Sequence, residues 1–321
     1  LGADAPYENM GTIQTKGWEL AIDYRHTFKN GLHFGVTASV ADDKTEVTKW
    51  TYNTKIPSYG ATGWWDKSAY KEGMVLGDIW GLQFDRFLTE DDFNADGSLK
   101  AGLPDQTKVF PAGYQFAPGD VLYKDLDNNG EIVKQTNTND KGDLSVIGNA
   151  LPRLQFGLNL DAAWKGFDIS MFFQGVAKRK LWAAGNQVLP GFTTGEPFYK
   201  GAEDYWTPEN TDAFYPRPMD YKQSASGNYS VNDRYLLNMA YLRLKTFTVG
   251  YSLPKVWLSK FKVQGLRVYF TGENLFTIDG VKPAIDPEIG IRTASGKSDQ
   301  RNFGRSYPYQ KTVSFGIQLS L

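Results

Sequence analysis

A short acidic segment has the residue types and the spacing of a calcium-binding loop. Asp125, Asp127 and Asn129 alternate with other residues and a glycine follows them, which gives the pattern D-x-D-x-N-G. Oxygen ligands at alternate positions before a sharp glycine turn suit Ca²⁺, and the main-chain carbonyl of Glu131 would be the next ligand. The last position of the standard loop, normally a carboxylate, is Thr136. The pattern therefore predicts either a bound Ca²⁺ or a solvated Asp/Asn turn, and in both cases a structural role.

Residue types that perform catalysis or bind nucleic acid are scarce or scattered. The chain has no cysteine, which excludes a thiolate metal site and a cysteine nucleophile. Its two histidines, His26 and His33, flank one short turn without a recognisable Ser or Asp arrangement. The 36 acidic and 35 basic residues nearly cancel, whereas nucleic-acid-binding proteins carry a clustered basic excess. We therefore expect neither an enzyme nor a nucleic-acid-binding protein.

Aromatic side chains in long polar stretches are the candidates for contact with a substrate or a partner. Rigid aromatic faces suit sugar rings and protein surfaces alike, because they bury a large area at little entropic cost. Trp182, Tyr205 and Trp206 are the first candidates, and the pair Trp64-Trp65 is the second. The alternative is that such side chains pack the long loops on themselves, and this alternative is favoured for Trp206.

The elements that must position these residues are β-strands. Alternation of apolar and polar residues with a period of two predicts seven of them. Asn30-Gly31 lies between two alternating runs and predicts a hairpin, while a change of phase between Leu244 and Phe247 predicts a β-bulge. We assign the segment 74–88 to a loop. The predicted strands cover residues 18–25, 32–40, 154–164, 167–174, 242–253, 266–273 and 313–321.

The connections between these strands differ strongly in length. The short ones lie at 29–31, 165–166 and 254–262, and the long ones at about 49–150, 181–233 and 277–306. An up-and-down order places every short turn at one end and every long loop at the other. Outer-membrane barrels are built in this way, with short periplasmic turns and long extracellular loops. Most predicted strands also have the length of about nine residues or more that a tilted strand needs to cross a bilayer.

An odd number of strands indicates that the barrel is larger than this chain. Seven strands do not close an up-and-down barrel of even strand number, and an open sheet would leave unpaired edges in lipid. The expected fold is therefore all-β, an antiparallel up-and-down transmembrane β-barrel of which this chain supplies the C-terminal seven strands. Residues 1–321 would then form part of one barrel domain.

Several stretches, taken in order, resemble the C-terminal part of the SusC/RagA family of TonB-dependent outer-membrane transporters from Bacteroidetes. The resemblance covers roughly residues 10–321, and the combination of motifs is more specific than any single one. The motifs are Gly119–Ile132 (GDVLYKDLDNNGEI), Val146–Asn149 (VIGN), Tyr205–Asn210 (YWTPEN), Pro216-Arg217, Tyr241–Lys245 (YLRLK), Val249–Pro254 (VGYSLP), Leu266–Tyr269 (LRVY) and Gly272–Phe276 (GENLF).

This resemblance implies a 22-stranded barrel in the bacterial outer membrane with an N-terminal plug. It also implies import of large nutrients, mainly glycans and in some members peptides, with energy from TonB. A SusD-like surface lipoprotein would cover the extracellular loops as a lid. The plug and the segment that contacts TonB would lie outside these 321 residues.

The family pattern also implies roles for two further sets of residues. Its closing acidic residue lies three positions before Val-Ile-Gly, which is Asp143 here, so Asp143 would complete the calcium loop across a Gln/Thr/Asn-rich insertion. The last residues are similar to the terminal signal that the barrel-assembly machinery recognises, with a final leucine in place of the usual phenylalanine; the alternative is an ordinary amphipathic edge strand. The matching positions of the signal are Ser314, Gly316, Leu319 and Leu321.

Two other functions compete with nutrient import. A calcium-containing, carbohydrate-binding β-sandwich module would fold from these residues alone and stay in aqueous buffer without detergent. An outer-membrane enzyme would need catalytic residues clustered at the loops, and the sequence contains no recognisable cluster of this kind. The sorting of the loops and the ordered motifs favour import.

Overall fold

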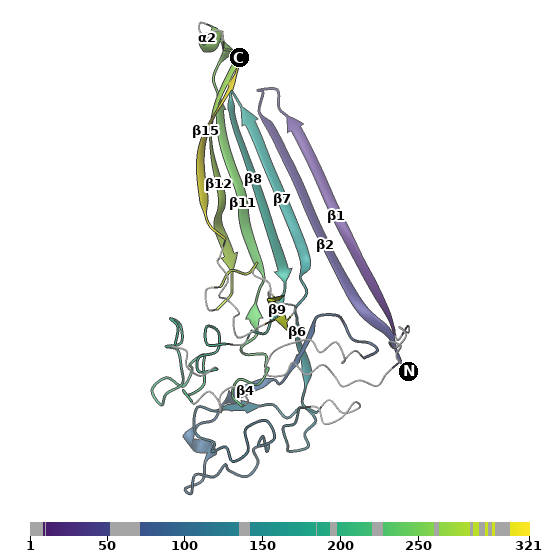
Figure 1. The fold of residues 1–321 in the computed structure, drawn as a ribbon, viewed down its shortest axis with the longest axis vertical. Coiled ribbons are helices and arrows are strands. Elements are labelled where there is room, and N and C mark those ends of the chain that lie inside the picture. The colour runs from purple at the N-terminus through teal and green to yellow at the C-terminus, as the bar shows by residue number, and fades with distance from the viewer. Residues whose placement is uncertain are drawn as a thin grey trace, which may run out of the picture.

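The computed structural model contains one long antiparallel sheet and a body formed by the loops at one end of it (Figure 1). No helix in the described part of the chain is long and apolar enough to cross a membrane. The structure describes residues 9, 11–51, 71–134, 142–183, 185–192, 198–219, 227–259, 263–282, 285–288, 293–294, 297–298 and 309–321.

The sheet has seven strands in sequence order, each antiparallel to the next, which confirms the predicted up-and-down arrangement. Only β1 and β15 lie at its edges. The strands are β1 (Gly11–Thr27), β2 (His33–Trp50), β7 (Arg153–Trp164), β8 (Phe167–Lys178), β11 (Tyr241–Ser252), β12 (Gly265–Asp279) and β15 (Thr312–Ser320).

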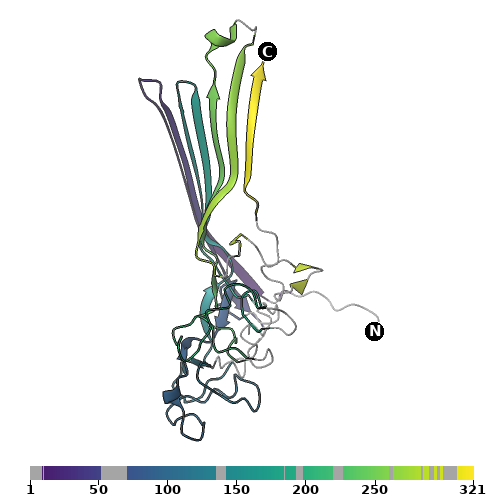
Figure 2. The same cartoon turned by 90° about the vertical axis from the view of Figure 1, so that its left-hand side faces the viewer.

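The short and long connections lie at opposite ends of the sheet. The turns 28–32, 165–166 and 253–264 are at the upper end in Figures 1 and 2, where α2 (Lys255–Leu258) forms part of the last turn and where β15 ends. The connections 51–152, 179–240 and 280–311 all leave from the lower end. Sequence-adjacent strands are therefore joined alternately by a short turn and by a long loop.

The two faces of the sheet differ in chemistry, as period-two alternation requires. Trp18, Leu20, Ile22 and Tyr24 of β1 are all exposed on one face, with 52% of Leu20 accessible. A β-sandwich would cover such a face with a second sheet, and the described residues contain no second sheet that covers it.

The other face is polar and its side chains interact across the strands. The Thr37 hydroxyl donates to a carboxylate oxygen of Asp23 at 2.6 Å. The Arg267 guanidinium donates to both carboxylate oxygens of Asp168 at 2.9 and 2.5 Å, although the two residues lie on β12 and β8 with β11 between them. This face of the sheet is therefore polar and connects neighbouring and next-neighbouring strands through its side chains.

Two glycines make room for two large side chains of the polar face. Gly250 and Gly316 flank Tyr269 on the neighbouring strands. A Cβ atom on Gly250 would lie 2.5 Å from the Arg267 guanidinium, and one on Gly316 would overlap the Tyr269 ring. Because neither glycine has a side chain, Arg267 and Tyr269 can lie along the sheet, with the Arg267 Cζ 4.9 Å from the Tyr269 ring centroid.

The predicted bulge in β11 is present. Pairing of β11 with both neighbours shifts register between Leu244 and Thr246, so Lys245 has no partner in either ladder. On the β12 side, Asn274 has a positive φ of 51°, a conformation that asparagine adopts more readily than most residues. The bulge explains why the apolar pattern changes phase at this position.

The loop body contains short strands that pair outside the main sheet, in the pairs β3–β6, β4–β5, β9–β10 and β13–β14. The segment 74–88 therefore belongs to the first long loop, as predicted. The elements are β3 (Asp78–Gly81), β4 (Phe84–Phe87), the 3₁₀ turn η1 (Glu90–Asp92), β5 (Val121–Tyr123), β6 (Ser145–Asn149), β9 (Lys180–Leu181), β10 (Leu237–Asn238), β13 (Thr293–Ala294) and β14 (Lys297–Ser298).

Two hydrophobic cores hold the loop body together. The first gathers Ile79 from the first long loop with Trp182 and Tyr235 from the second. The second core includes Leu82 and Trp206, again from both loops. The first two long loops are therefore packed as one unit.

Candidate functional site

The acidic loop after β5 brings three carboxylates together. Ligand oxygens of Asp125, Asp127 and Asp143 all lie within 4.8 Å of one another. Backbone N–H groups orient two of the side chains: that of Gly130 donates to Asp125 at 2.7 Å, and those of Leu126 and Val133 donate to Asp143 at 2.8 and 2.7 Å. Three converging hard oxygens suit Ca²⁺.

The other two predicted ligands have different surroundings. The Asn129 side-chain oxygen accepts from the Glu131 N–H at 2.8 Å, and its amide nitrogen donates to Asp127 at 3.0 Å. The Glu131 carboxylate pairs with the Lys108 ammonium. A metal ligand from Glu131 would therefore be its main-chain carbonyl, as the sequence pattern predicts.

The pKa values of Asp125 and Asp127 shift in opposite directions. Desolvation raises the pKa of Asp127, and the negative charges of Asp143 and Asp125 raise it further. Desolvation also acts on Asp125, but hydrogen bonds from backbone N–H groups, that of Gly130 first, outweigh it and lower the pKa of Asp125. The repulsion at Asp127 is of the kind that a bound cation relieves.

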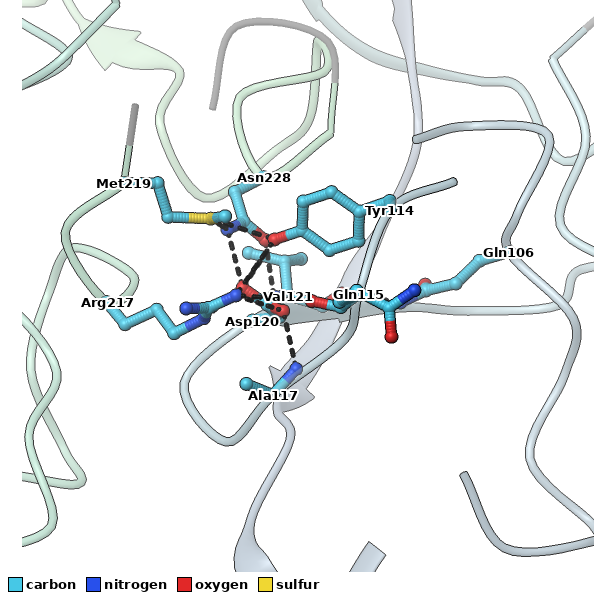
Figure 3. Close-up of polar contacts among 9 residues, drawn as sticks. All are labelled: Gln106, Tyr114, Gln115, Ala117, Asp120, Val121, Arg217, Met219 and Asn228. Carbon is cyan, nitrogen blue, oxygen red and sulfur yellow. Dashed lines mark hydrogen bonds and ion pairs between the residues drawn. The ribbon is translucent and has the colours of Figure 1, made fainter. Parts of the chain in front are cut away.

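A second polar centre, around Asp120, joins the first two long loops (Figure 3). The Asp120 side chain is fully buried. The Arg217 Nε donates to its Oδ1 at 2.8 Å and the Arg217 Nη2 to its Oδ2 at 3.2 Å. The Asn228 side-chain amide donates to Oδ1 at 2.9 Å, and the Tyr114 hydroxyl donates to the same oxygen at 2.8 Å. A buried carboxylate satisfied in this way is costly to disturb.

The surroundings of Asp120 extend this connection. Burial raises the pKa of the Tyr114 phenol, and the negative charge of Asp120 raises it further, so the hydroxyl remains a donor at neutral pH. The Asn228 side-chain oxygen accepts from the Val121 N–H at 2.8 Å, and the Tyr123 hydroxyl donates to the Gly227 main-chain carbonyl at 2.8 Å. The Asp120 centre thus fixes β5 against the second long loop.

The predicted aromatic contact residues fall into three situations. Trp182 and Trp206 are 1% and 7% exposed and lie in the two cores, which favours loop packing, the alternative considered for them. Tyr205 is 40% exposed and lines a cavity of about 680 Å³. Trp64 and Trp65 lie outside the described residues.

Charged residues of β11 bind the third long loop. Arg243 Nη2 donates to Asp286 at 2.7 Å, and the Lys245 ammonium donates to Glu288 at 2.6 Å. Tyr309, next to the start of β15, has its ring centroid 5.3 Å from the Arg243 Cζ. The polar face of the sheet therefore holds one end of this loop.

The residues of the predicted assembly signal lie on or beside the edge strand β15. Gly316 pairs with Tyr269, and Ser314 pairs with Thr271. Leu319 and Leu321 are exposed. Their exposure fits an apolar edge that a receptor protein or lipid can reach, and recognition itself stays a prediction.

The Asp120 centre and the acidic residues of the third loop were not identified from sequence as functional. Asp120 and Arg217 each lie inside a motif quoted above, and membership in these motifs is the one sequence feature that indicates their importance. Nothing in the local pattern pairs them, because they come from different loops. Asp286 and Glu288 occur in a proline-containing stretch without strand periodicity.

Comparisons with known proteins agree with this geometry. No family model matches the chain. TonB-dependent receptor P3 of Formosa agariphila is 26% identical over 330 residues, which cover 99% of this chain and 30% of that protein. TonB-dependent receptor SusC of Bacteroides thetaiotaomicron is 22% identical over 322 residues, covering 98% of the chain and 27% of that protein. Both relatives are named as receptors, which is not an enzyme class.

Solved structures show the same fold. The structure of the RagAB peptide transporter matches with a TM-score of 0.64 and 18% identity, over 98% of this chain and 30% of that one. The closed-closed state of the RagAB peptide importer matches with a TM-score of 0.58 and 17% identity, over 98% of this chain and 30% of that one. The chain thus spans about 30% of the length of the proteins it matches.

Proposed function

Because the chain belongs to the SusC/RagA family of TonB-dependent receptors, we propose that it is the C-terminal part of a barrel that imports a large nutrient across the bacterial outer membrane. The main support is the seven-stranded sheet, whose short turns all lie at one end and whose long loops all lie at the other. In the outer membrane the turns would face the periplasm and the loop body the cell exterior.

In this proposal each face of the sheet has its own environment. The exposed apolar side chains of β1 and β15 contact lipid, and the polar face lines the passage. The free edges of β1 and β15 pair with strands from elsewhere in the longer protein, because unpaired backbone groups are very costly in lipid. A 22-stranded barrel, as the family resemblance implies, supplies those strands.

The loop body would meet the substrate and a partner. It has its own hydrophobic cores and an aromatic cavity, so it presents an ordered surface. We propose that a SusD-like lipoprotein covers it, that TonB acts through the remainder of the protein, and that the substrate is a glycan rather than a peptide.

We also propose that Asp125, Asp127 and Asp143 hold a Ca²⁺ ion together with the Glu131 carbonyl. The support is the convergence of their oxygens, together with the desolvation and the repulsion by neighbouring carboxylates that raise the pKa of Asp127. The ion would tie Asp143 to the turn after β5 and so order this part of the loop body. It would have no part in a reaction.

Fractionation of cells that carry the full-length protein tests the transport proposal. We expect the protein in the outer-membrane fraction, together with a lipoprotein that co-purifies with it. Protease added to intact cells should cut the exposed loop around Lys200 and spare β1 and β2. Recovery of the protein in aqueous buffer without detergent, as a monodisperse species, would contradict the proposal and favour the β-sandwich alternative.

Metal analysis of the purified full-length protein tests the calcium proposal. We expect one Ca²⁺ to be lost from the Asp127→Asn variant and retained by Asp96→Asn, which changes an exposed aspartate of the same long loop. Chelation of Ca²⁺ should lower the stability of the loop body by about 1 kcal/mol if the site has the modest affinity of extracellular modules. Equal metal content in all three proteins would rule the site out.

A further inference from the structure

The cavity beside Tyr205 has a rigid aromatic floor. Tyr215 and Tyr229, which line it, are 5% and 3% exposed. Both rings pack against Tyr235, at centroid distances of 6.1 and 5.3 Å. The Tyr215 hydroxyl donates to the Val188 carbonyl at 3.0 Å. The floor is therefore already formed, and a ligand would not have to order it.

The rim of the same cavity exposes further aromatic rings. Phe198 is 63% exposed, Tyr205 is 40% exposed, and Tyr199 is also exposed. Large aromatic side chains left open beside a packed aromatic floor form a surface whose hydration is unfavourable. They offer flat faces to a ligand ring.

The charge of the cavity limits the class of ligand. Its charged described residues are Lys200 and Glu203, which have opposite signs. No arginine is among the described residues that line it, so the bidentate recognition of carboxylate or sulfate groups that arginine provides is absent there. The lining therefore suits a ligand without net charge.

The backbone of the cavity wall disfavours an extended peptide. Pro190, Pro216 and Pro218 have no N–H group to donate. The Tyr215 N–H already donates to the Asp204 carbonyl at 2.9 Å, and the Tyr215 carbonyl accepts from the Trp206 N–H at 3.0 Å. A peptide that binds by adding a strand needs free groups of this kind.

We infer that this cavity is a binding subsite for one or two rings of a neutral oligosaccharide, which stack on Tyr205 and on the neighbouring rim aromatics. The inference rests on the proposed function and deepens it, because it assigns residues and a charge class to substrate recognition. The apolar face of a pyranose packs on an aromatic ring, while its hydroxyls reach water at the rim or the Lys200 and Glu203 side chains.

Binding to the purified full-length transporter in detergent tests this inference. The probes are hexasaccharides of glucose, xylose, mannose and galactose, a galacturonate hexasaccharide and a proline-containing decapeptide, each titrated to millimolar concentration in a calorimeter. At least one neutral hexasaccharide should bind, and the galacturonate and the peptide should not. Tyr205→Ala should weaken the neutral sugar about tenfold, the loss expected when one stacking ring is removed.

Tyr205→Phe is the matched control, because it keeps the ring and removes only the hydroxyl. It should bind the sugar within about twofold of the parent protein, a difference of well under 1 kcal/mol. Circular dichroism and protease resistance of both variants show that the loop body is still folded. Loss of binding in Tyr205→Ala with an intact loop body then assigns the effect to stacking.

Three results would overturn the inference. They are the absence of binding by every neutral hexasaccharide, binding that is insensitive to Tyr205→Ala, and Tyr205-dependent binding of the peptide or the galacturonate instead. None of these results bears on membrane location. If the protein fractionates with the outer membrane but gives one of these three results, the proposed function stands and the sugar site is wrong. If the protein is instead soluble and binds the sugar through Tyr205, the proposed function is wrong and the inferred sugar site stands.

Discussion

The sheet and the loop body use apolar side chains in opposite ways. Every residue of β1 is exposed, including its tryptophan and its aliphatic residues. In the loop body, Ile79 and Leu82 are fully buried, and Trp182 is almost so. The sheet exposes its apolar side chains on one face and forms its ion pairs on the other. The loop body has buried hydrophobic cores like those of a water-soluble protein.

This contrast shows which solvent each region is built for. A sheet with an exposed apolar face is stable only where that face meets lipid or another protein. The loop body instead gains stability from burial away from water. Substitutions that are harmless in one region should therefore be damaging in the other.

The largest effect is expected at the Asp120 centre. Asp120→Ala leaves the Arg217 guanidinium partly buried without its carboxylate, which costs about 3–5 kcal/mol when a buried pair is broken. Limited proteolysis of the full-length protein should show the loop body opening, while the heat-modifiable migration of the barrel stays unchanged. Asp91→Ala, at an exposed aspartate of η1, is the control and should leave both unchanged.

A smaller effect is expected on the apolar face of the sheet. Ile22→Lys places a charge among lipid-facing residues and should destabilise the barrel by about 2–4 kcal/mol if the position lies near the bilayer midplane. Ala21→Lys, one residue earlier on the polar face, should be tolerated. Unfolding in lipid vesicles measures both, and equal losses would show that the two faces were assigned to the wrong environments.

The smallest effect is an acid sensitivity of the first long loop. Asp92 accepts from Arg86 Nη1 and Nη2 at 2.6 and 2.8 Å. The hydrogen bond from Arg86 is the main cause that lowers the pKa of Asp92 from 3.8 to about 2, while burial opposes it and the Thr89 N–H adds to it. The folded-state pKa is the lower one, so this stabilisation is complete above about pH 4 and is lost as the pH falls towards 2.

Asp92→Asn should remove this contribution at neutral pH. We expect a loss of about 1 kcal/mol, because solvent around the half-exposed Arg86 screens the pair. Unfolding of the loop body, followed by protease susceptibility between pH 7 and pH 2, measures the difference. The stabilities of the parent protein and the variant should become equal at the acidic end of the range. A difference in stability that stays constant with pH would exclude ionised Asp92 as its source.

The sheet was predictable from sequence because apolar and polar residues alternate within each strand, and this alternation reflects the different environments of its two faces. Trp18, Leu20 and Ile22 alternate with polar residues, and this pattern locates a strand without knowledge of its neighbours. The ends of the strands were less predictable: β1 begins at Gly11, where it pairs with Trp50 at the end of β2. At this end of the hairpin the chain stays extended through backbone pairing, without an alternating pattern to indicate it.

The candidate sites in the loops were only partly predictable. Asp125 and Asp127 lie in a local motif, so their convergence followed from spacing alone. The partner of Asp120 comes from another loop, and no periodicity connects the two. The sequence does not distinguish Trp182 from Tyr205, because both are aromatic residues of the second long loop. The packing of the first two loops decides that Trp182 is buried and that Tyr205 lines the cavity.

Gly250 and Gly316 have a consequence for the calibre of the proposed passage. The clear width of a pore depends on how far side chains extend from its wall. At Gly250 and Gly316 only a hydrogen atom extends from the backbone. Arg267 and Tyr269 can therefore lie flat. A methyl group at either glycine would push one of them towards the axis, so two residues without side chains would influence the largest cargo that can move past this wall.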